Sequence, residues 1–300
     1  MNKVKALTIL DSLAKFHKLK RGKYQIVMDF LPFYIIMIAV APMRAGPDQR
    51  SEQITQARLG EIVRFIEEHD GWYKVKLETD GYVGYISPGM VKGFSEKEAD
   101  KWRKSDKFIF GDRTAEILDA PFKSASLIRT AHMGAKLPVE SRKGSWVELN
   151  LPDGINGWTH SRQFQLQSAG TREGIAKTAQ LFLGAPYLWG GRSTAGFDCS
   201  GFVQTVFELN GIDLPRDTYQ QIRVGEKIGE DYNKAEKGDL VFFDNGKGDV
   251  SHIGIYLGDG RFIHSSGIVR INGLDSEDPN HSKGLRERFM HVRSIGDMLL

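Results

Sequence analysis

The stretch GFDCSGFVQTVFELNG, residues 196–211, decides the fold of the C-terminal part of the chain. The apolar residues that follow Cys199 recur at the spacing of a buried helix, and Gly211 stands where a helix C-cap belongs. The cysteine is therefore expected at or near the N-terminus of this helix. Unpaired N–H groups and the helix dipole favour an anion there, so the position predicts a lowered thiol pKa, a reactive thiolate and donors for an oxyanion. The alternative is a cysteine that simply packs in the core.

Composition sets broad limits on the protein. The chain has 300 residues with 41 Lys and Arg against 38 Asp and Glu, a net charge of +3. This balance gives no electrostatic argument for a nucleic-acid partner. Cys199 is the single cysteine of the sequence, which excludes an internal disulfide and a cysteine-cluster metal site.

A second stretch, VSHIGIYLGDGRFIHSS at residues 250–266, supplies two histidines. It is typical of a β-hairpin with a Gly-Asp-Gly turn. A turn centred on Asp259 places His252 and His264 on one face of the hairpin, whereas a two-residue loop would place them on opposite faces. A thiolate nucleophile needs such an imidazole partner. Zinc binding is disfavoured because no third and fourth ligand follow at a recognisable spacing, and no metal site is expected.

The N-terminal half contains a repeat. Residues 71–86 and 145–158 each comprise an alternating strand, a glycine turn and a second aromatic strand, a pattern of small β barrels. We place the barrels at 33–92 and 106–165. They are similar to bacterial SH3-type domains. Residues 93–105 form a helical linker in which Ser95 and Glu98 make a capping box. A third domain covers 166–300 and opens with a helix capped by Thr171.

Residues 30–41, FLPFYIIMIAVA, form the longest apolar run. About 12 residues are too few for a membrane-spanning helix, so no stable membrane span is expected. We interpret the run as a buried β-strand of the first barrel. A signal or anchor is the alternative, because basic residues precede the run. Residues 1–32 are an N-terminal extension without an assigned role, and 1–29 have the periodicity of a weak basic helix.

Four motifs of the C-terminal domain resemble the NlpC family of bacterial cell-wall peptidases: YLWGG at 187–191, FDCSGFV at 197–203, KGDLVFF at 237–243 and SHIGIYL at 251–257. The resemblance implies an α+β fold with a papain-like catalytic domain after the two barrels. It implies that Cys199 is the nucleophile, that His252 is the general base and that His264 orients His252. Tyr187 and Ser200 are then substrate-binding residues beside the cysteine.

The arrangement as a whole resembles γ-D-glutamyl-L-diamino acid endopeptidases of this family. That resemblance implies a murein stem peptide with a free N-terminal L-Ala as partner, release of L-Ala-D-Glu, and no cofactor. Asp217 matches the amine-binding aspartate, and Tyr82 matches a tyrosine of the first barrel. Glu52 is the candidate for a first-barrel glutamate, with Glu61 as the weaker candidate.

Three alternatives stay open at this point. Two of them are enzymes of the same family, an amidase and a crosslink-cleaving hydrolase. The third is a non-catalytic cell-wall binding protein. A free-amine stem peptide is met during wall recycling, so we expect a cytoplasmic protein, with a periplasmic or secreted form as the alternative. The oligomeric state and the identity of the diamino acid are not readable from the sequence.

Overall fold

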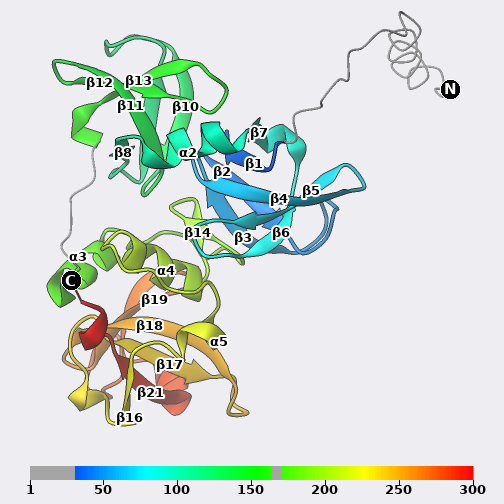
Figure 1. Cartoon of the computed structure of the whole chain (residues 1–300). Coiled ribbons are helices and arrows are strands. Elements are labelled where there is room, and N and C mark those ends of the chain that lie inside the picture. The colour runs from blue at the N-terminus through cyan, green and yellow to red at the C-terminus, as the bar shows by residue number, and fades with distance from the viewer. Residues whose placement is uncertain (1–30, 164–169, 300) are drawn as a thin grey trace, which may run out of the picture. The chain divides into compact units, whose positions relative to one another are not determined.

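The computed structural model describes residues 31–163 and 170–299, and Figure 1 shows the arrangement of the elements. The helix expected in residues 1–29 lies outside the described residues. Residues 31–300 cluster as one compact unit. Within the described part, no helix is long and apolar enough to cross a membrane.

The first barrel is a seven-stranded antiparallel sheet in the order β3-β2-β6-β5-β4-β1-β7. Its strands are β1 (Phe33–Ile36), β2 (Val40–Arg44), β3 (Gln53–Arg58), β4 (Ile62–His69), β5 (Trp72–Leu77), β6 (Val83–Ile86) and β7 (Val91–Phe94). The apolar run at 30–41 is wrong as a single strand, because the chain bends between β1 and β2. β1 pairs with β4 and β7, whereas β2 pairs with β3 and β6.

The second barrel repeats the first. Its strand order is β10-β9-β13-β12-β11-β8, which matches the order of β3 to β1. The strands are β8 (Lys107–Ile109), β9 (Thr114–Leu118), β10 (Leu127–His132), β11 (Lys136–Lys143), β12 (Trp146–Asn150) and β13 (Asn156–His160). The repeated aromatic pairs of the sequence are thus β5–β6 in one barrel and β12–β13 in the other.

Helix α2 (Glu96–Lys104) joins the barrels. The predicted capping box is confirmed, since Ser95 caps the N-terminus and the Glu98 carboxylate accepts from the Ser95 backbone N–H at 2.8 Å. Trp102 of this helix is buried and belongs to a hydrophobic core that includes Phe33 of β1 and Phe108 of β8. The linker is therefore packed into a core that both barrels share.

The C-terminal domain combines a six-stranded sheet, in the order β16-β21-β17-β18-β19-β20, with helices packed on it. The strands are β16 (Glu226–Gly229), β17 (Leu240–Asp244), β18 (Val250–Gly258), β19 (Arg261–Ser266), β20 (Ile268–Gly273) and β21 (Phe289–Ser294). The small ribbon β14 (Arg192–Ser193) and β15 (Gly196–Phe197) precedes the sheet, and the helices are α3 (Arg172–Gln180), α4 (Cys199–Glu208), α5 (Thr218–Gln221) and α6 (Lys283–Glu287). Thr171 caps α3 as predicted.

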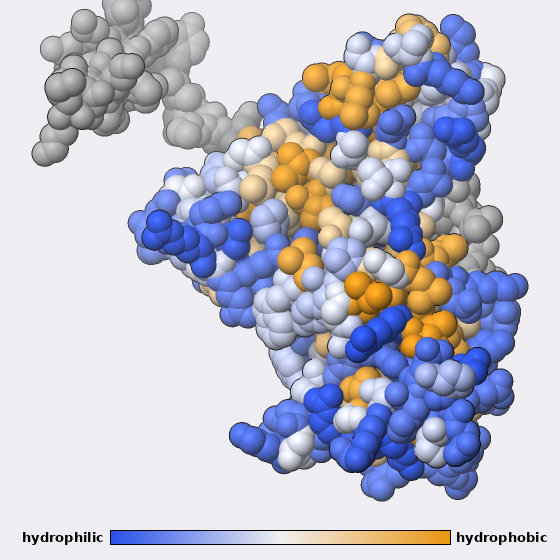
Figure 2. Space-filling view, turned by 180° about the vertical axis from the view of Figure 1, so that it is seen from behind, coloured by the Kyte–Doolittle hydropathy of each residue, from blue (hydrophilic) through white to orange (hydrophobic). Residues whose placement is uncertain are grey.

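Helix α4 carries the core of this domain. Phe202, Val203, Val206 and Phe207 are fully buried, and α4 contacts β18 and β19. On the face seen in Figure 2, apolar side chains form patches between hydrophilic ones. The predicted α+β fold, with two small β barrels before a domain of sheet and helices, is confirmed.

Candidate active site

Cys199 is the first residue of α4, and Asp198 is its N-cap. The Asp198 carboxylate accepts a hydrogen bond from the backbone N–H of Gly201 at 2.6 Å, which satisfies one of the donors that a helix start leaves unpaired. Cys199 is 9% exposed and lines a pocket of about 510 Å³. The predicted place of the cysteine at a helix start is confirmed, and it borders a space large enough for part of a peptide.

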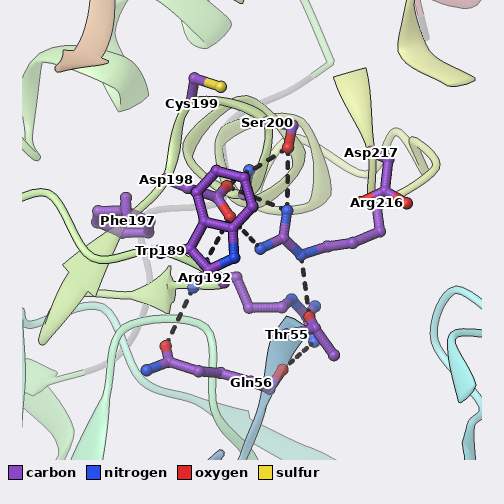
Figure 3. Close-up of polar contacts among 12 residues, drawn as sticks. Thr55, Gln56, Trp189, Arg192, Phe197, Asp198, Cys199, Ser200, Arg216 and Asp217 are labelled. Atoms are coloured by element: carbon purple, nitrogen blue, oxygen red, sulfur yellow. Dashed lines mark hydrogen bonds and ion pairs between the residues drawn. The ribbon is translucent and has the colours of Figure 1, made fainter. Parts of the chain in front are cut away.

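A buried arginine holds the carboxylate next to the cysteine. Arg216 donates from Nη2 to Asp198 Oδ2 at 2.6 Å and from Nη1 to Oδ1 at 3.1 Å. Its Nε donates to Thr55 Oγ1 of β3 at 2.9 Å, and its Nη1 also donates to Ser200 Oγ at 3.0 Å. Figure 3 shows this guanidinium between the start of α4 and the first barrel. One cation therefore ties the barrel to the residue that precedes Cys199.

The pKa of the Cys199 thiol is shifted in the direction opposite to the one that the sequence predicts. Burial raises the pKa of Cys199, and the Asp198 carboxylate raises it further. The Thr218 hydroxyl, whose Oγ1 lies 3.7 Å from Sγ, lowers the pKa, as do the Ser200 N–H and Arg216. The expected lowered pKa is therefore wrong for the free protein, because burial outweighs the helix start. At neutral pH the thiol is protonated.

The register of the histidine hairpin is set by three pairs, Ile255 with Ile263, Tyr256 with Phe262 and Gly258 with Arg261. The loop is thus the two-residue loop Asp259-Gly260, which by itself would separate the two imidazoles. A bulge between Tyr256 and Gly258 restores the register. When this register is continued along both strands, His252 stands opposite Ser266, as predicted. The bulge, and not the length of the loop, produces this pairing.

The two imidazoles are hydrogen bonded to each other. His252 Nε2 lies 2.7 Å from His264 Nδ1, and the rings meet edge to face. Gly254 faces His264 across the hairpin, where a Cβ would approach the His264 Cβ to 3.2 Å. The same Cβ would approach Cδ2 of the Phe262 ring to 2.9 Å, so the absent side chain leaves room for both neighbouring residues of β19. The prediction that both histidines share a face is confirmed.

Both histidines are neutral at pH 7. Burial lowers the pKa of His252 to about 3, and electrostatic repulsion from His264, Arg288 and Arg270 lowers the pKa further when His252 is protonated. Burial likewise lowers the pKa of His264 to about 4, while Asn272 opposes it. In the resting protein the thiol and both imidazoles are therefore uncharged.

The pocket collects the substrate-binding candidates of the sequence, with the exception of the weaker candidate Glu61. Its lining includes Glu52, Tyr82, Tyr187, Cys199, Ser200 and Asp217. Val250 and Ser251, which precede His252 on β18, line the same pocket. The thiol, the two barrel residues and the start of the strand that carries His252 therefore meet at one cavity, whose lining includes neither imidazole.

Asp217 and Tyr82 bring the two domains together at this pocket. The Tyr82 hydroxyl lies 3.2 Å from Asp217 Oδ1 and 3.1 Å from Oδ2, and donates to the carboxylate. Burial raises the pKa of Asp217, whereas the Tyr82 hydrogen bond and Arg216 lower it. Burial and the Asp217 charge also raise the pKa of Tyr82, so the phenol remains a donor.

Glu52 is held at the pocket by an indole. Trp189 Nε1 donates to Glu52 Oε1 at 2.6 Å, and the neighbouring Gln53 amide donates to the Trp189 carbonyl at 2.8 Å. The other candidate, Glu61, lies instead in a buried ion cluster with Arg58 and Arg192. Of the two glutamates, the structure brings Glu52 to the cysteine's pocket.

Several site residues were missed by the sequence analysis. These are Trp189, Thr218 and Tyr219 on the pocket wall, the Asp198–Arg216 pair and Asn272 beside His264. The aspartate directly before Cys199 is a typical N-cap residue and could have been found. The others carry no local signal, because each meets its partner only when separate helices, strands or loops pack together. Within the described residues, no group of three or more metal-ligating side chains could hold a metal ion.

A thiol at the start of a helix that packs on the two strands carrying a hydrogen-bonded imidazole pair is the arrangement of a papain-like cysteine peptidase. Two family models match the chain: the NlpC/P60 family over residues 184–294, and the bacterial dipeptidyl-peptidase Sh3 domain over residues 43–88. The chain belongs to the NlpC/P60 family of cysteine peptidases.

Relatives cover most of the chain. A Bacillus subtilis protein named gamma-D-glutamyl-L-lysine dipeptidyl-peptidase is 48% identical over 224 residues, 70% of this chain and 71% of that protein. A Bacillus cereus protein of the same name is 32% identical over 227 residues, 70% of this chain and 66% of the relative. Lysinibacillus sphaericus dipeptidyl-peptidase 6 is 29% identical over 277 residues, 87% of this chain and 98% of that protein.

A solved structure also resembles this chain over most of its length. The crystal structure of an NlpC/P60 family protein from Bacillus cereus superposes with a TM-score of 0.75 at 26% identity. The match covers 89% of this chain and 100% of that one. The similarity therefore includes the barrels as well as the peptidase domain.

Proposed function

We propose that this enzyme hydrolyses the γ-D-Glu–diamino acid bond of murein stem peptides that have a free N-terminal L-Ala, and releases L-Ala-D-Glu. The observation that carries the proposal is that the carboxylates of Asp217 and Glu52 line the same pocket as Cys199. Relatives named gamma-D-glutamyl-L-lysine dipeptidyl-peptidase support the choice of bond.

The two carboxylates explain the selection of a free amine. An ammonium group gains charge-assisted hydrogen bonds from carboxylates, whereas an N-acylated terminus offers no positive charge. Glu52 comes from the first barrel and Asp217 from the peptidase domain, and Tyr82 hydrogen bonds to Asp217 across the junction. The barrel thus closes the pocket on the amino-terminal side, and cleavage two residues further on releases a dipeptide.

The chemistry begins from uncharged groups. His252 accepts the Cys199 proton as the sulfur attacks the amide carbon, which gives a tetrahedral oxyanion and an imidazolium. Backbone N–H groups at the start of α4, that of Ser200 included, stabilise the oxyanion, and Tyr187 lies on the same wall. The imidazolium then protonates the leaving amine, and water hydrolyses the acyl-enzyme.

The test compares L-Ala-γ-D-Glu-L-Lys with its N-acetylated form, followed by product mass. We expect kcat/KM for the free peptide to exceed that for the acetylated one by roughly 100-fold, since hydrogen bonds to charged groups contribute about 1.5–3 kcal/mol each. Cys199→Ala should abolish hydrolysis. Asp217→Asn should raise KM for the free peptide by about tenfold without changing weak cleavage of the acetylated one.

Each part of the proposal has its own contradicting outcome. Equal cleavage of the two peptides would remove the free-amine specificity, and an active Cys199→Ala would remove the nucleophile. Products other than L-Ala-D-Glu and the released amine would indicate an amidase or a crosslink hydrolase. Exchange of L-Lys for diaminopimelate in the substrate identifies the diamino acid.

We also propose that the enzyme is cytoplasmic. The reason is chemical: a stem peptide with a free amino terminus is the form that a cell handles when it recycles its wall. Fractionation of cells that carry the full chain, with immunodetection in each fraction, tests this. Recovery mainly from the periplasm or the medium would overturn the proposal.

A further inference from the structure

Asn272 on β20 stands next to the imidazole pair. It lies directly opposite Phe262 in the sheet, so it is the diagonal neighbour of His264 on the same face. Asn272 Oδ1 lies 2.9 Å from His264 Nε2. The hydrogen-bonded row therefore runs from His252 through His264 to Asn272.

The orientation of the Asn272 amide follows from its other contact. Nδ2 lies 2.8 Å from the backbone carbonyl of Asn280, and a carbonyl oxygen can only accept. The same carbonyl also accepts from Gly273 N–H at 3.0 Å, which fixes the loop that presents it. With the amide nitrogen committed to Asn280, the oxygen must face His264.

The protons of the row can now be assigned. Because Asn272 Oδ1 only accepts, His264 carries its proton on Nε2. A neutral His264 then has a lone pair on Nδ1, which accepts the proton that His252 carries on Nε2. Burial lowers the pKa values of His252 and His264 to about 3 and about 4, so both rings are neutral when this assignment applies.

We propose that Asn272 is a positioning residue that sets the tautomer of both imidazoles and leaves Nδ1 as the basic nitrogen of His252. The Asn272 amide holds the rings without adding a charge. The imidazolium that forms during attack is therefore not stabilised by a carboxylate at this position. The catalytic consequence rests on the proposed function, whereas the tautomers themselves do not.

The direct test is ¹⁵N NMR of the two rings in the full chain labelled at histidine. Wild-type protein at neutral pH should show both His252 and His264 protonated at Nε2. Asn272→Leu removes the acceptor and should shift His264 toward the Nδ1-protonated form. Asn280→Ala is the matched control, because it keeps the backbone carbonyl that holds Asn272 and should leave both tautomers unchanged.

Kinetics supply the second readout. Asn272→Leu should lower kcat by about 10- to 100-fold with little change in KM, since general base catalysis contributes about 10²- to 10⁴-fold. Asn272→Asp retains an acceptor and adds a negative charge, which favours the charged imidazole. Its rings should keep the wild-type tautomers, and the acid limb of its kcat profile should move to higher pH.

The outcomes separate this inference from the proposed function. Nδ1-protonated His264 in the wild type, or unchanged tautomers in folded Asn272→Leu, would overturn the inference. Should Asn272→Leu fail to fold, an unshifted acid limb in Asn272→Asp would overturn it instead. Absence of peptide hydrolysis would overturn the proposed function while the tautomer measurement still decides the role of Asn272.

Discussion

The two barrels share one strand order but meet the peptidase domain in different ways. Their second hairpins align so closely that Tyr82 of the first barrel corresponds to Ile155 of the second, 73 positions later. Tyr82 hydrogen bonds to Asp217 at the pocket, whereas Ile155 is 55% exposed. The fold of a barrel therefore does not determine whether that barrel contributes to the site. The side chains that face the peptidase domain determine it.

Buried charge marks the same difference. Arg58 and Glu61 of the first barrel meet Arg192 and Glu208 of the peptidase domain, and we call these four residues the buried quartet. Arg58 contacts Glu208 at 2.6 Å and Glu61 at 2.9 Å, and Arg192 contacts the same two carboxylates at 3.0 and 3.1 Å. From the second barrel, Lys136 approaches the quartet: its Nζ lies 3.6 Å from Glu208, and its side chain is 46% exposed.

The largest expected effect comes from breaking the quartet. Arg58→Met leaves two buried carboxylates with one arginine, and loss of one partner of a buried pair costs about 3–5 kcal/mol. We expect a drop of this size in the free energy of unfolding, measured by urea denaturation. Cleavage of free-amine peptide should also weaken, because Arg58 ends the strand that follows Glu52.

The matched control is Arg142→Met in the second barrel. Arg142 is exposed and lies 3.8 Å from the exposed Asp106, so the same substitution should change stability by less than about 0.5 kcal/mol. An equal decrease in the free energy of unfolding in the two variants would show that the buried quartet stabilises the protein no more than a surface ion pair does.

An intermediate effect is expected at the corresponding hairpin positions. Tyr82→Phe removes a hydroxyl that lowers the Asp217 pKa, and the lost hydrogen bond is worth about 1 kcal/mol. KM for the free-amine peptide should rise about fivefold, and cleavage of the acetylated peptide should not change. Without the hydroxyl, the Asp217 pKa rises further. As the pH falls, Asp217 is therefore protonated earlier, and binding of the free peptide should weaken at a higher pH than in the wild type.

The control for this prediction is Ile155→Ala. Ile155 contributes nothing to the pocket lining, so KM and its pH profile should match the wild type. Steady-state kinetics of both variants between acidic and neutral pH provide the comparison. A Tyr82→Phe profile identical to that of Ile155→Ala would place the amine elsewhere.

The barrels and the catalytic groups were predictable because their signals are local. Alternating strands reveal the repeat, and Cys199, His252 and His264 stand in short motifs. The Thr55–Arg216 contact spans 161 positions and exists only once the first barrel docks on the peptidase domain. The rise in the Cys199 pKa likewise depends on three-dimensional burial, which a helix-start pattern does not report.

The hairpin shows a different limit. The turn centred on Asp259 gives the correct face for both histidines, but the hairpin reaches this register through a two-residue loop and a bulge before Gly258, which the sequence pattern does not show. Asn272 was missed for a similar reason, since an asparagine two strands from His252 has no catalytic signal until the sheet pairs. Sequence thus identifies the reacting groups, and sheet register identifies the residues that position them.

The smallest effect is expected for Lys136→Met, which removes the second barrel's charge from the quartet. Glu208 already has two buried arginine partners, and the charges of Arg58 and Arg192 lower its pKa more than Lys136 does. A half-exposed lysine at 3.6 Å contributes about 0–1 kcal/mol, so the urea midpoint should move only slightly and the preference for free-amine peptide should persist. A loss as large as that of Arg58→Met would mean that the second barrel is fastened through Glu208 as firmly as the first, and that the two barrels differ at the pocket alone.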